Sequence, residues 1–110
     1  MEQVLLVMSN LPDVASAHML ARRLVEQKLV ACVNCLPYVH SVYRWQGALE
    51  EADEVTVLMK TTQARYAEVE QTIRAAHPYQ LPEIVAIPIA AGLPAYLQWV
   101  IDETGQYGHA

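Results

Sequence analysis

VACVNCLPYVHSVYRWQGALEEADEVTVLMK, residues 30–60, determines the fold, because it reads as two long strands joined by a tight turn. Alternate residues from Val39 to Trp45 share one strand face, and Gln46-Gly47 supplies a turn in which glycine tolerates positive φ. Both arms exceed the usual strand length of about five or six residues. We therefore predict a hairpin that projects beyond its own domain and recruits a partner through its exposed edges.

Acidic residues crowd the start of the returning arm. They are Glu50, Glu51, Asp53 and Glu54. We interpret them as a solvated tip, or as a block against edge-to-edge pairing, because no softer metal ligand stands among them.

Strands and helices alternate on either side of the hairpin. The apolar run at residues 4–8 predicts a central strand, and Asp13 can cap the helix that follows it. A right-handed crossover is expected from this strand to the hairpin. After the hairpin, Thr62 can cap a second helix, which ends at His77-Pro78.

The C-terminal part adds one strand and one helix. Residues 84–89 form a strand that Pro88 restricts to an edge or a bulge, and Pro94 begins a third helix. The resulting order, β-α-β-β-α-β with an extra C-terminal helix, predicts a ferredoxin-like α+β sandwich. Residues 1–110 are expected to form a single domain.

Composition indicates a buried interface and excludes several partners. Hydrophobic residues make up 54% of the chain and charged residues 17%, which is more apolar surface than a small monomer hides. The net charge is −5 and the seven Lys and Arg are scattered, so no nucleic-acid partner is expected. No membrane span and no signal peptide is recognised, so we expect a cytoplasmic protein with reduced thiols and no membrane partner.

The segment HPYQLPEI, residues 77–84, is called the elbow below. Its two prolines, Pro78 and Pro82, fix their own φ and bias the preceding residues toward extended conformations. A stiff connector that carries an imidazole, a phenol and a carboxylate indicates groups held in a fixed geometry. The alternative is that Pro78 merely ends a helix and Tyr79 covers the edge of the core.

Cys32 and Cys35 form a Cys-x-x-Cys motif in a strand context. Redox catalysis is disfavoured because no helix N-terminus lowers a thiol pKa there, and a closed zinc site needs about four ligands. Residues three apart on a strand also point to opposite faces. We expect at least one of the two to pack as a small hydrophobe, with cuprous copper the ion that the sulfur ligands would favour.

Signatures of catalysis are missing from the sequence. Ser9 and Ser41 lack a nucleophile elbow, and no glycine-rich phosphate loop is present, so no enzyme activity is expected. Among the remaining unusual residues, the aromatic ones read as interface packing and Lys60 and Glu83 as a partly buried pair. This remaining set comprises Tyr43, Trp45, Lys60, Tyr79, Glu83 and Trp99.

Several spaced motifs follow one another over about residues 4–102. In order, they are Ala31-Cys32-Val33-Asn34 with Pro37, Ser41-x-Tyr43-x-Trp45-x-Gly47, Lys60-Thr61, His77-Pro78-Tyr79-x-x-Pro82-Glu83-Ile84 and Tyr96-Leu97-x-Trp99. Together they resemble the CutA family of divalent-cation tolerance proteins. The resemblance implies a tight homotrimer similar to PII signalling proteins, with hairpins that cross between subunits. It also implies a role in divalent-metal tolerance, copper binding in some members, and no established enzyme activity.

Three departures from the family pattern are recognised. Ala48 stands where a lysine often follows the hairpin glycine. Tyr38 follows Pro37 where the family commonly has glycine, so the bend is expected to differ. Gln80 replaces a frequent glutamate in the elbow, which weakens a hard-metal site there.

Residues and resemblance together predict a homotrimer that binds copper or another divalent metal, or a small molecule, without an organic cofactor. The metal ligands are expected among Cys32, His77 and Glu83, while the role of Cys35 stays open. Two alternative functions remain. One is a PII-like module that binds an anionic metabolite through Lys60, and the other is a cysteine-dependent redox protein. The predicted intersubunit cleft is lined by Tyr43, Trp45, Lys60, His77, Tyr79, Glu83 and Trp99.

Overall fold

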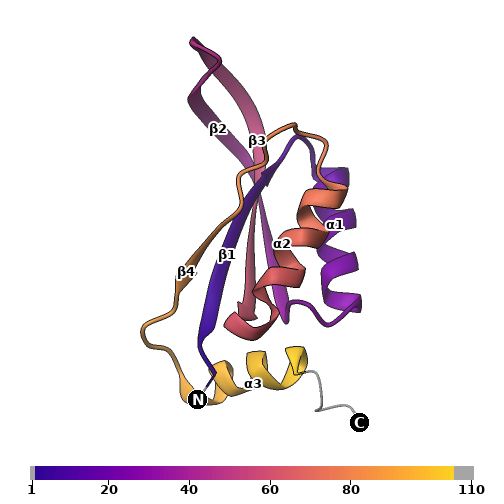
Figure 1. Cartoon of the computed structure of the whole chain (residues 1–110), viewed down its shortest axis with the longest axis vertical. Helices are drawn as coiled ribbons and strands as arrows, with labels where there is room; N and C mark the ends of the chain where they lie inside the picture. Colours follow the sequence, from indigo (N-terminus) through magenta and orange to yellow (C-terminus); the bar gives the residue numbers. More distant parts are fainter. Residues whose placement is uncertain (1, 106–110) are drawn as a thin grey trace.

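The computed structural model describes residues 2–105 and contains one antiparallel sheet with helices on one face and at one end (Figure 1). The strands, in the order β2-β3-β1-β4 across the sheet, are β1 (Val4–Leu11), β2 (Cys32–Trp45), β3 (Ala48–Thr62) and β4 (Val85–Pro88). The helices are α1 (Val14–Glu26), α2 (Tyr66–Ala76), α3 (Pro94–Thr104) and a short 3-10 turn, η1 (Gln63–Arg65). Because β3 lies antiparallel between β1 and β2, those two are parallel and form the split βαβ unit of the predicted ferredoxin-like α+β fold.

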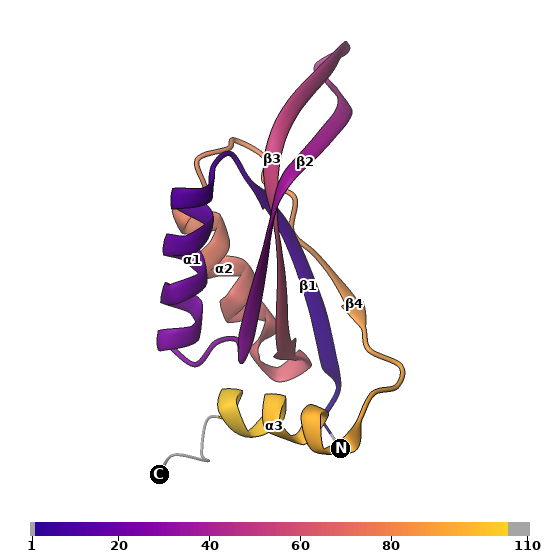
Figure 2. The ribbon, with the colours of Figure 1, turned by 180° about the vertical axis from the view of Figure 1, so that it is seen from behind.

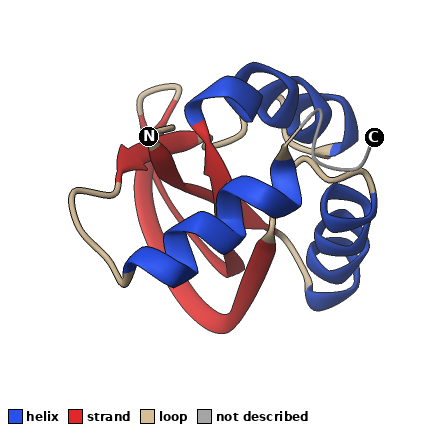
Figure 3. Cartoon of the chain, turned by 90° about the horizontal axis from the view of Figure 1, so that it is seen from below, coloured by secondary structure: helices blue, strands red, loops and turns tan. Residues whose placement is uncertain are grey.

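Helices α1 and α2 lie side by side over one face of the sheet (Figures 1 and 2). The core between the layers includes Val7, Leu24, Met59 and Ile73, all with 0% exposure. Helix α3 crosses the end of the sheet, where Val100 packs with Val4 and Ala31 in a second cluster (Figure 3). The predicted extra C-terminal helix is therefore present, and it closes one end of the sheet.

The two expected helix caps had different outcomes. Asp13 caps α1, and its Oδ1 accepts a hydrogen bond from the backbone N–H of Ser16 at 2.7 Å. This bond lowers the pKa of Asp13, because it stabilises the carboxylate. The prediction for Thr62 was wrong, since Thr62 precedes η1 and makes no capping hydrogen bond, and α2 begins only after Arg65.

The long hairpin is confirmed, with 14 residues in β2 and 15 in β3. Gln46 and Gly47 have φ of 50° and 83°, as a two-residue type I′ turn requires. A bulge between Leu36 and Val39 interrupts the pairing, and there Tyr38 has a φ of 66° with a side chain 97% exposed. Beyond the bulge the hairpin leaves the two-layer body (Figure 2). We call residues 39–54 the outer hairpin.

The sheet face opposite α1 and α2 carries apolar side chains. Strand register places Leu6 and Met8 of β1 on this face beside Leu58 of β3 and Ile87 and Val85 of β4. None of these residues belongs to the core between the sheet and the two helices. We call this surface the open face; Val85 and Ile87 are each nearly half exposed on it.

A buried hydroxyl on β1 predicts a stabilising substitution. Ser9 has 0% exposure, and its Oγ finds no hydrogen-bond partner within residues 2–105. Burial of an unpaired hydroxyl costs about 1–3 kcal/mol, so Ser9→Ala should raise the free energy of unfolding by about 1 kcal/mol. Urea unfolding at fixed protein concentration measures this change.

Thr61 provides the matched control for that substitution, because its hydroxyl is equally buried but paired. It donates to the carbonyl oxygen of Leu29 at 2.7 Å. Thr61→Val should lower stability by about 1 kcal/mol. If Ser9→Ala lowers the free energy of unfolding as much as Thr61→Val does, the Ser9 hydroxyl is paired in solution.

Candidate ligand-binding groove

A groove of about 830 Å³ lies between the outer hairpin and the elbow. Its walls are formed by residues 41–45 of β2, Glu54 of β3, Asn10 of β1 and residues 78–83 of the elbow. Four of the seven residues predicted for the cleft meet here, namely Tyr43, Trp45, Tyr79 and Glu83. Aromatic rings, prolines and carboxylates therefore share one concave surface.

The elbow is anchored by a buried imidazole. The His77 side chain donates from Nε2 to the carbonyl oxygen of Asn10 at 2.7 Å, while its Nδ1 accepts the backbone N–H of Tyr79 at 3.1 Å. Its ring also packs against that of Tyr79, with centroids 4.7 Å apart. Both ring nitrogens are thus engaged, so a metal at His77 must displace one of these hydrogen bonds.

Tyr79 connects the elbow to the hairpin. Its hydroxyl donates to Oε2 of Glu54 at 2.9 Å. Burial, followed by this hydrogen bond and the negative charge of Glu54, raises the pKa of Tyr79 to about 12, so the phenol stays a hydrogen-bond donor at neutral pH. Glu54 is only 7% exposed, which corrects the interpretation of this residue as part of a solvated tip; Glu50, Glu51 and Asp53 are exposed as expected.

Asn10, which the sequence reasoning did not single out, links three segments at the floor of the groove. Its Oδ1 accepts the Thr56 hydroxyl at 2.7 Å, and its Nδ2 donates to Oε1 of Glu83 at 3.2 Å. Its main-chain carbonyl holds His77. An asparagine at the end of a strand is the only local signal, and it does not identify these partners.

The remaining predicted residues lie at the opposite end of the sheet. Lys60 donates to Oδ1 of Asn34, and its Nζ lies 3.9 Å from Sγ of Cys32. Trp99 packs against Tyr96 on α3, with ring centroids 5.5 Å apart. Burial and the neighbouring Cys32 thiol raise the pKa of Tyr96. Lys60, Trp99 and Cys32 therefore do not reach the groove of their own chain.

The predicted metal ligands are also separated within one chain. Cys32 pairs with Lys60 and Lys60 with Leu6, whereas His77 binds Asn10, four residues further along β1 and roughly 13 Å away at about 3.3 Å per residue. Within residues 2–105, no group of three or more His, Cys, Asp or Glu side chains is arranged to hold a metal. A site that uses Cys32 together with Glu83 therefore needs a second copy of the chain.

The two cysteines point to opposite faces, as predicted. Cys35 packs against the core between the sheet and the helices, and burial raises the pKa of its thiol. Cys32 faces Lys60 on the open face, and both thiols are free. The pair is therefore not arranged as a redox centre.

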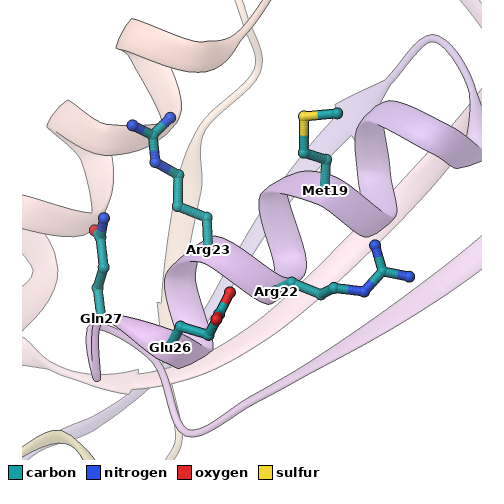
Figure 4. A pocket seen from close by; sticks show the side chains of 5 residues that line it. All are labelled: Met19, Arg22, Arg23, Glu26 and Gln27. Atoms are coloured by element: carbon teal, nitrogen blue, oxygen red, sulfur yellow. The ribbon is translucent and has the colours of Figure 1, made fainter.

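A second hollow of about 440 Å³ lies on the outer surface of α1 (Figure 4). The side chains of Met19, Arg22, Arg23, Glu26 and Gln27 spread along the helix and do not converge on a point (Figure 4). This arrangement is that of a solvated helix face.

None of the helices within residues 2–105 is long and apolar enough to cross a membrane.

The outer hairpin carries a clamped histidine, which predicts a pH effect. Nδ1 of His40 lies 2.9 Å from Asp53 Oδ1, and its Nε2 lies 2.7 Å from Glu51 Oε1. Hydrogen bonds to Asp53 and then Glu51 raise the pKa of His40. The folded hairpin therefore binds this proton more tightly than the unfolded chain. The resulting stabilisation is fully present below the unfolded pKa of about 6.5 and disappears as the pH rises through the folded pKa.

We expect an NMR titration of the His40 ring protons to give a pKa above that of a free imidazole. A double variant, Glu51→Gln with Asp53→Asn, should bring this pKa back toward its ordinary value. An unchanged pKa in the double variant would show that the two carboxylates do not hold the ring in solution.

Residues 5–103 match the family model described as CutA1 divalent ion tolerance protein. The divalent-cation tolerance protein CutA of Thermus thermophilus is 44% identical over 105 residues, which cover 96% of this chain and all of the relative, and its solved structure has a TM-score of 0.89. The Xenopus laevis protein CutA homolog is 43% identical over 91 residues, which cover 83% of this chain and 60% of that longer protein.

A solved structure described as the periplasmic divalent cation tolerance protein CutA from Archaeoglobus fulgidus is 37% identical, with a TM-score of 0.89 and coverage of 92% of this chain and 98% of that one. The match to the family model spans nearly the whole described fold, including the hairpin, the elbow and α3. This chain therefore belongs to the CutA1 family of divalent ion tolerance proteins.

Proposed function

We propose that this protein is a homotrimer that contributes to divalent-metal tolerance by binding a metal ion or a small ligand at clefts between subunits. The observation that carries the proposal is the amount of apolar surface left uncovered in one chain. The outer hairpin extends beyond the body (Figure 1), Val42 and Leu49 on it are 57% and 67% exposed, and the open face presents Val85 and Ile87. A second and third copy would cover these surfaces.

A binding role, rather than catalysis, fits the groups that meet in the groove. They form a recognition surface of aromatic rings and carboxylates, and the family is named for tolerance rather than for a reaction. No organic cofactor is part of the proposal. The cytoplasm is the proposed location, because two free thiols suit a reducing compartment.

Sedimentation and native mass spectrometry test assembly and metal binding separately. Analytical ultracentrifugation at micromolar protein should give one species of three protomer masses, and native mass spectra with copper should show added metal on that trimer. A monomer in sedimentation would contradict the assembly. A trimer that takes up no copper or zinc would contradict the metal role.

Copper or another divalent metal is proposed to bind between subunits, with Cys32, His77 and Glu83 as the candidate ligands. Cys32 offers a soft thiol and Glu83 a hard carboxylate, and these select different ions. Copper titrations of Cys32→Ser and Glu83→Gln should therefore identify which end of the sheet contributes a metal ligand. Unchanged affinity in both variants, with the trimer intact, would remove both residues from the metal site.

A second candidate function is the binding of an anionic metabolite, as in a PII-like module. It is favoured by Lys60, whose ammonium contacts Asn34 and Cys32 and forms no ion pair within residues 2–105. Loss of anion binding in Lys60→Ala, measured without metal, would support this alternative. A cysteine-dependent redox role is the weakest candidate, because Cys32 and Cys35 occupy opposite faces.

A further inference from the structure

The carboxylate of Glu54 forms part of the groove wall without a cationic partner. Glu54 is 7% exposed and borders the groove, and its Oε2 accepts a hydrogen bond from the Tyr79 hydroxyl. None of the ion pairs within residues 2–105 involves Glu54. A buried carboxylate with one neutral donor is poorly compensated for its lost hydration. A cation that enters the groove would supply the missing partner.

The other residues of the groove wall also suit a cationic ligand. Glu83 adds a second carboxylate, paired only with the neutral amide of Asn10 at 3.2 Å. Tyr43 and Trp45 add aromatic rings, whose faces attract cations. Among residues 2–105, the cationic residue of the wall is Arg44, whose Nη1 lies 3.5 Å from the carbonyl oxygen of Gly47 at the hairpin turn. Because the wall carries two carboxylates and one guanidinium, its net charge is negative.

The surroundings also make the electrostatic potential in the groove negative. Burial is the main cause of the raised pKa of Tyr79, followed by its hydrogen bond to Glu54, and the negative charges of Glu54 and of Asp13, which precedes α1, add to the shift. Glu50 lies opposite Tyr43 across the hairpin. The whole chain carries a net charge of −5. A potential of this sign concentrates cations and repels anions.

We propose that the groove binds a small organic cation, an ammonium or guanidinium group carried on an apolar or aromatic body. The inference rests on the proposed function, because it names a ligand class for the same cleft. The cationic group pairs with Glu54 and Glu83, while the body lies against Trp45 and Tyr79. A volume of about 830 Å³ is within the range of small-molecule sites, roughly 300–1,000 Å³.

Isothermal titration with 2-phenylethylammonium, compared with 3-phenylpropionate, tests the proposal. The two probes share a ring and a two-carbon linker but carry opposite charges. Wild-type protein should bind the ammonium probe saturably and the carboxylate probe not at all. Glu54→Gln keeps an acceptor for the Tyr79 hydroxyl but removes the charge, so its affinity should fall by roughly tenfold or more.

Glu51→Gln is the matched control. It removes a carboxylate from the same strand, but Glu51 contacts His40 and does not border the groove, so its affinity for the ammonium probe should be unchanged. Should Glu54→Gln fail to fold, Glu83→Gln is the second variant, since Glu83 is exposed and its loss should weaken binding severalfold. Equal binding of the two probes, or undiminished binding by a folded Glu54→Gln variant, would overturn the proposal.

Failure here can be told apart from failure of the proposed function. Native mass spectra of the same samples report the trimer and its copper content independently of the organic probe. A trimer that binds copper but not 2-phenylethylammonium overturns only the ligand class. A monomer that binds no metal overturns the proposed function itself.

Discussion

Replacing His77 with alanine should lower the free energy of unfolding by about 2–4 kcal/mol, because it removes the partners of two backbone groups at once. The Asn10 carbonyl loses the Nε2 donor at 2.7 Å, and the Tyr79 N–H loses its Nδ1 acceptor at 3.1 Å. The residue is 8% exposed, so water does not readily replace the ring. Urea unfolding at equal protein concentration measures the effect.

His18 is the matched control, since it is an exposed histidine on α1 and His18→Ala should change stability by less than about 0.5 kcal/mol. Copper titration of the folded His77→Ala variant separates a ligand from a packing residue. A stability loss with unchanged copper affinity makes His77 a structural anchor of the elbow. A loss of copper affinity with unchanged stability would contradict the hydrogen bonds described above.

The hairpin could be predicted from sequence because its causes are local. Side-chain alternation sets the strands, and a positive φ at Gln46 and Gly47 sets the turn. Tyr38 was recognised as a departure from the family's glycine, and the structure gives it a φ of 66°, a conformation that costs a tyrosine roughly 1–2 kcal/mol. The exact position of the bulge depends on how β2 and β3 pair, which no single strand determines.

The start of α2 shows where a local signal failed. Thr62 has the residue type and position of a helix cap, yet Gln63–Arg65 form a 3-10 turn before the α-helix begins. The predicted end of this helix at His77-Pro78 was right, since α2 ends at Ala76. Pro78 therefore located the end of the helix, while its first residues depended on how the chain leaves β3.

The groove was only half predictable, for a physical reason. Tyr43, Trp45, Tyr79 and Glu83 stood out by residue type, and the structure brings them together. Glu54 was read as solvated because it follows other acidic residues, but its burial depends on Tyr79, 25 residues further along the chain. Partners this distant are set by tertiary packing, which neither composition nor spacing reports.

Ile87→Arg should convert the proposed trimer to monomers at micromolar concentration while the fold is kept. Ile87 is 49% exposed in one chain and faces the same side of the sheet as Leu6, so an arginine there has access to water in a monomer. In a threefold assembly that buries the open face, each copy loses about 0.7–1.5 kcal/mol of apolar burial, because only the exposed half of Ile87 is left for the interface to cover. Because symmetry repeats the change, that loss is roughly 2–5 kcal/mol per trimer. Unpaired buried charges add to this cost.

Met19→Arg is the control that adds the same charge elsewhere. Met19 lies on the outer surface of α1 (Figure 4) and is 69% exposed, and α1 covers the other face of the sheet (Figure 1). Sedimentation equilibrium of both variants, with circular dichroism to confirm the fold, should give one protomer mass for Ile87→Arg and three for Met19→Arg. A folded Ile87→Arg variant that stays trimeric at the lowest measurable concentration would show that β4 and the open face lie outside the interface. The interface would then have to form through other exposed apolar side chains, among them Val42 and Leu49 of the outer hairpin and Trp99 of α3.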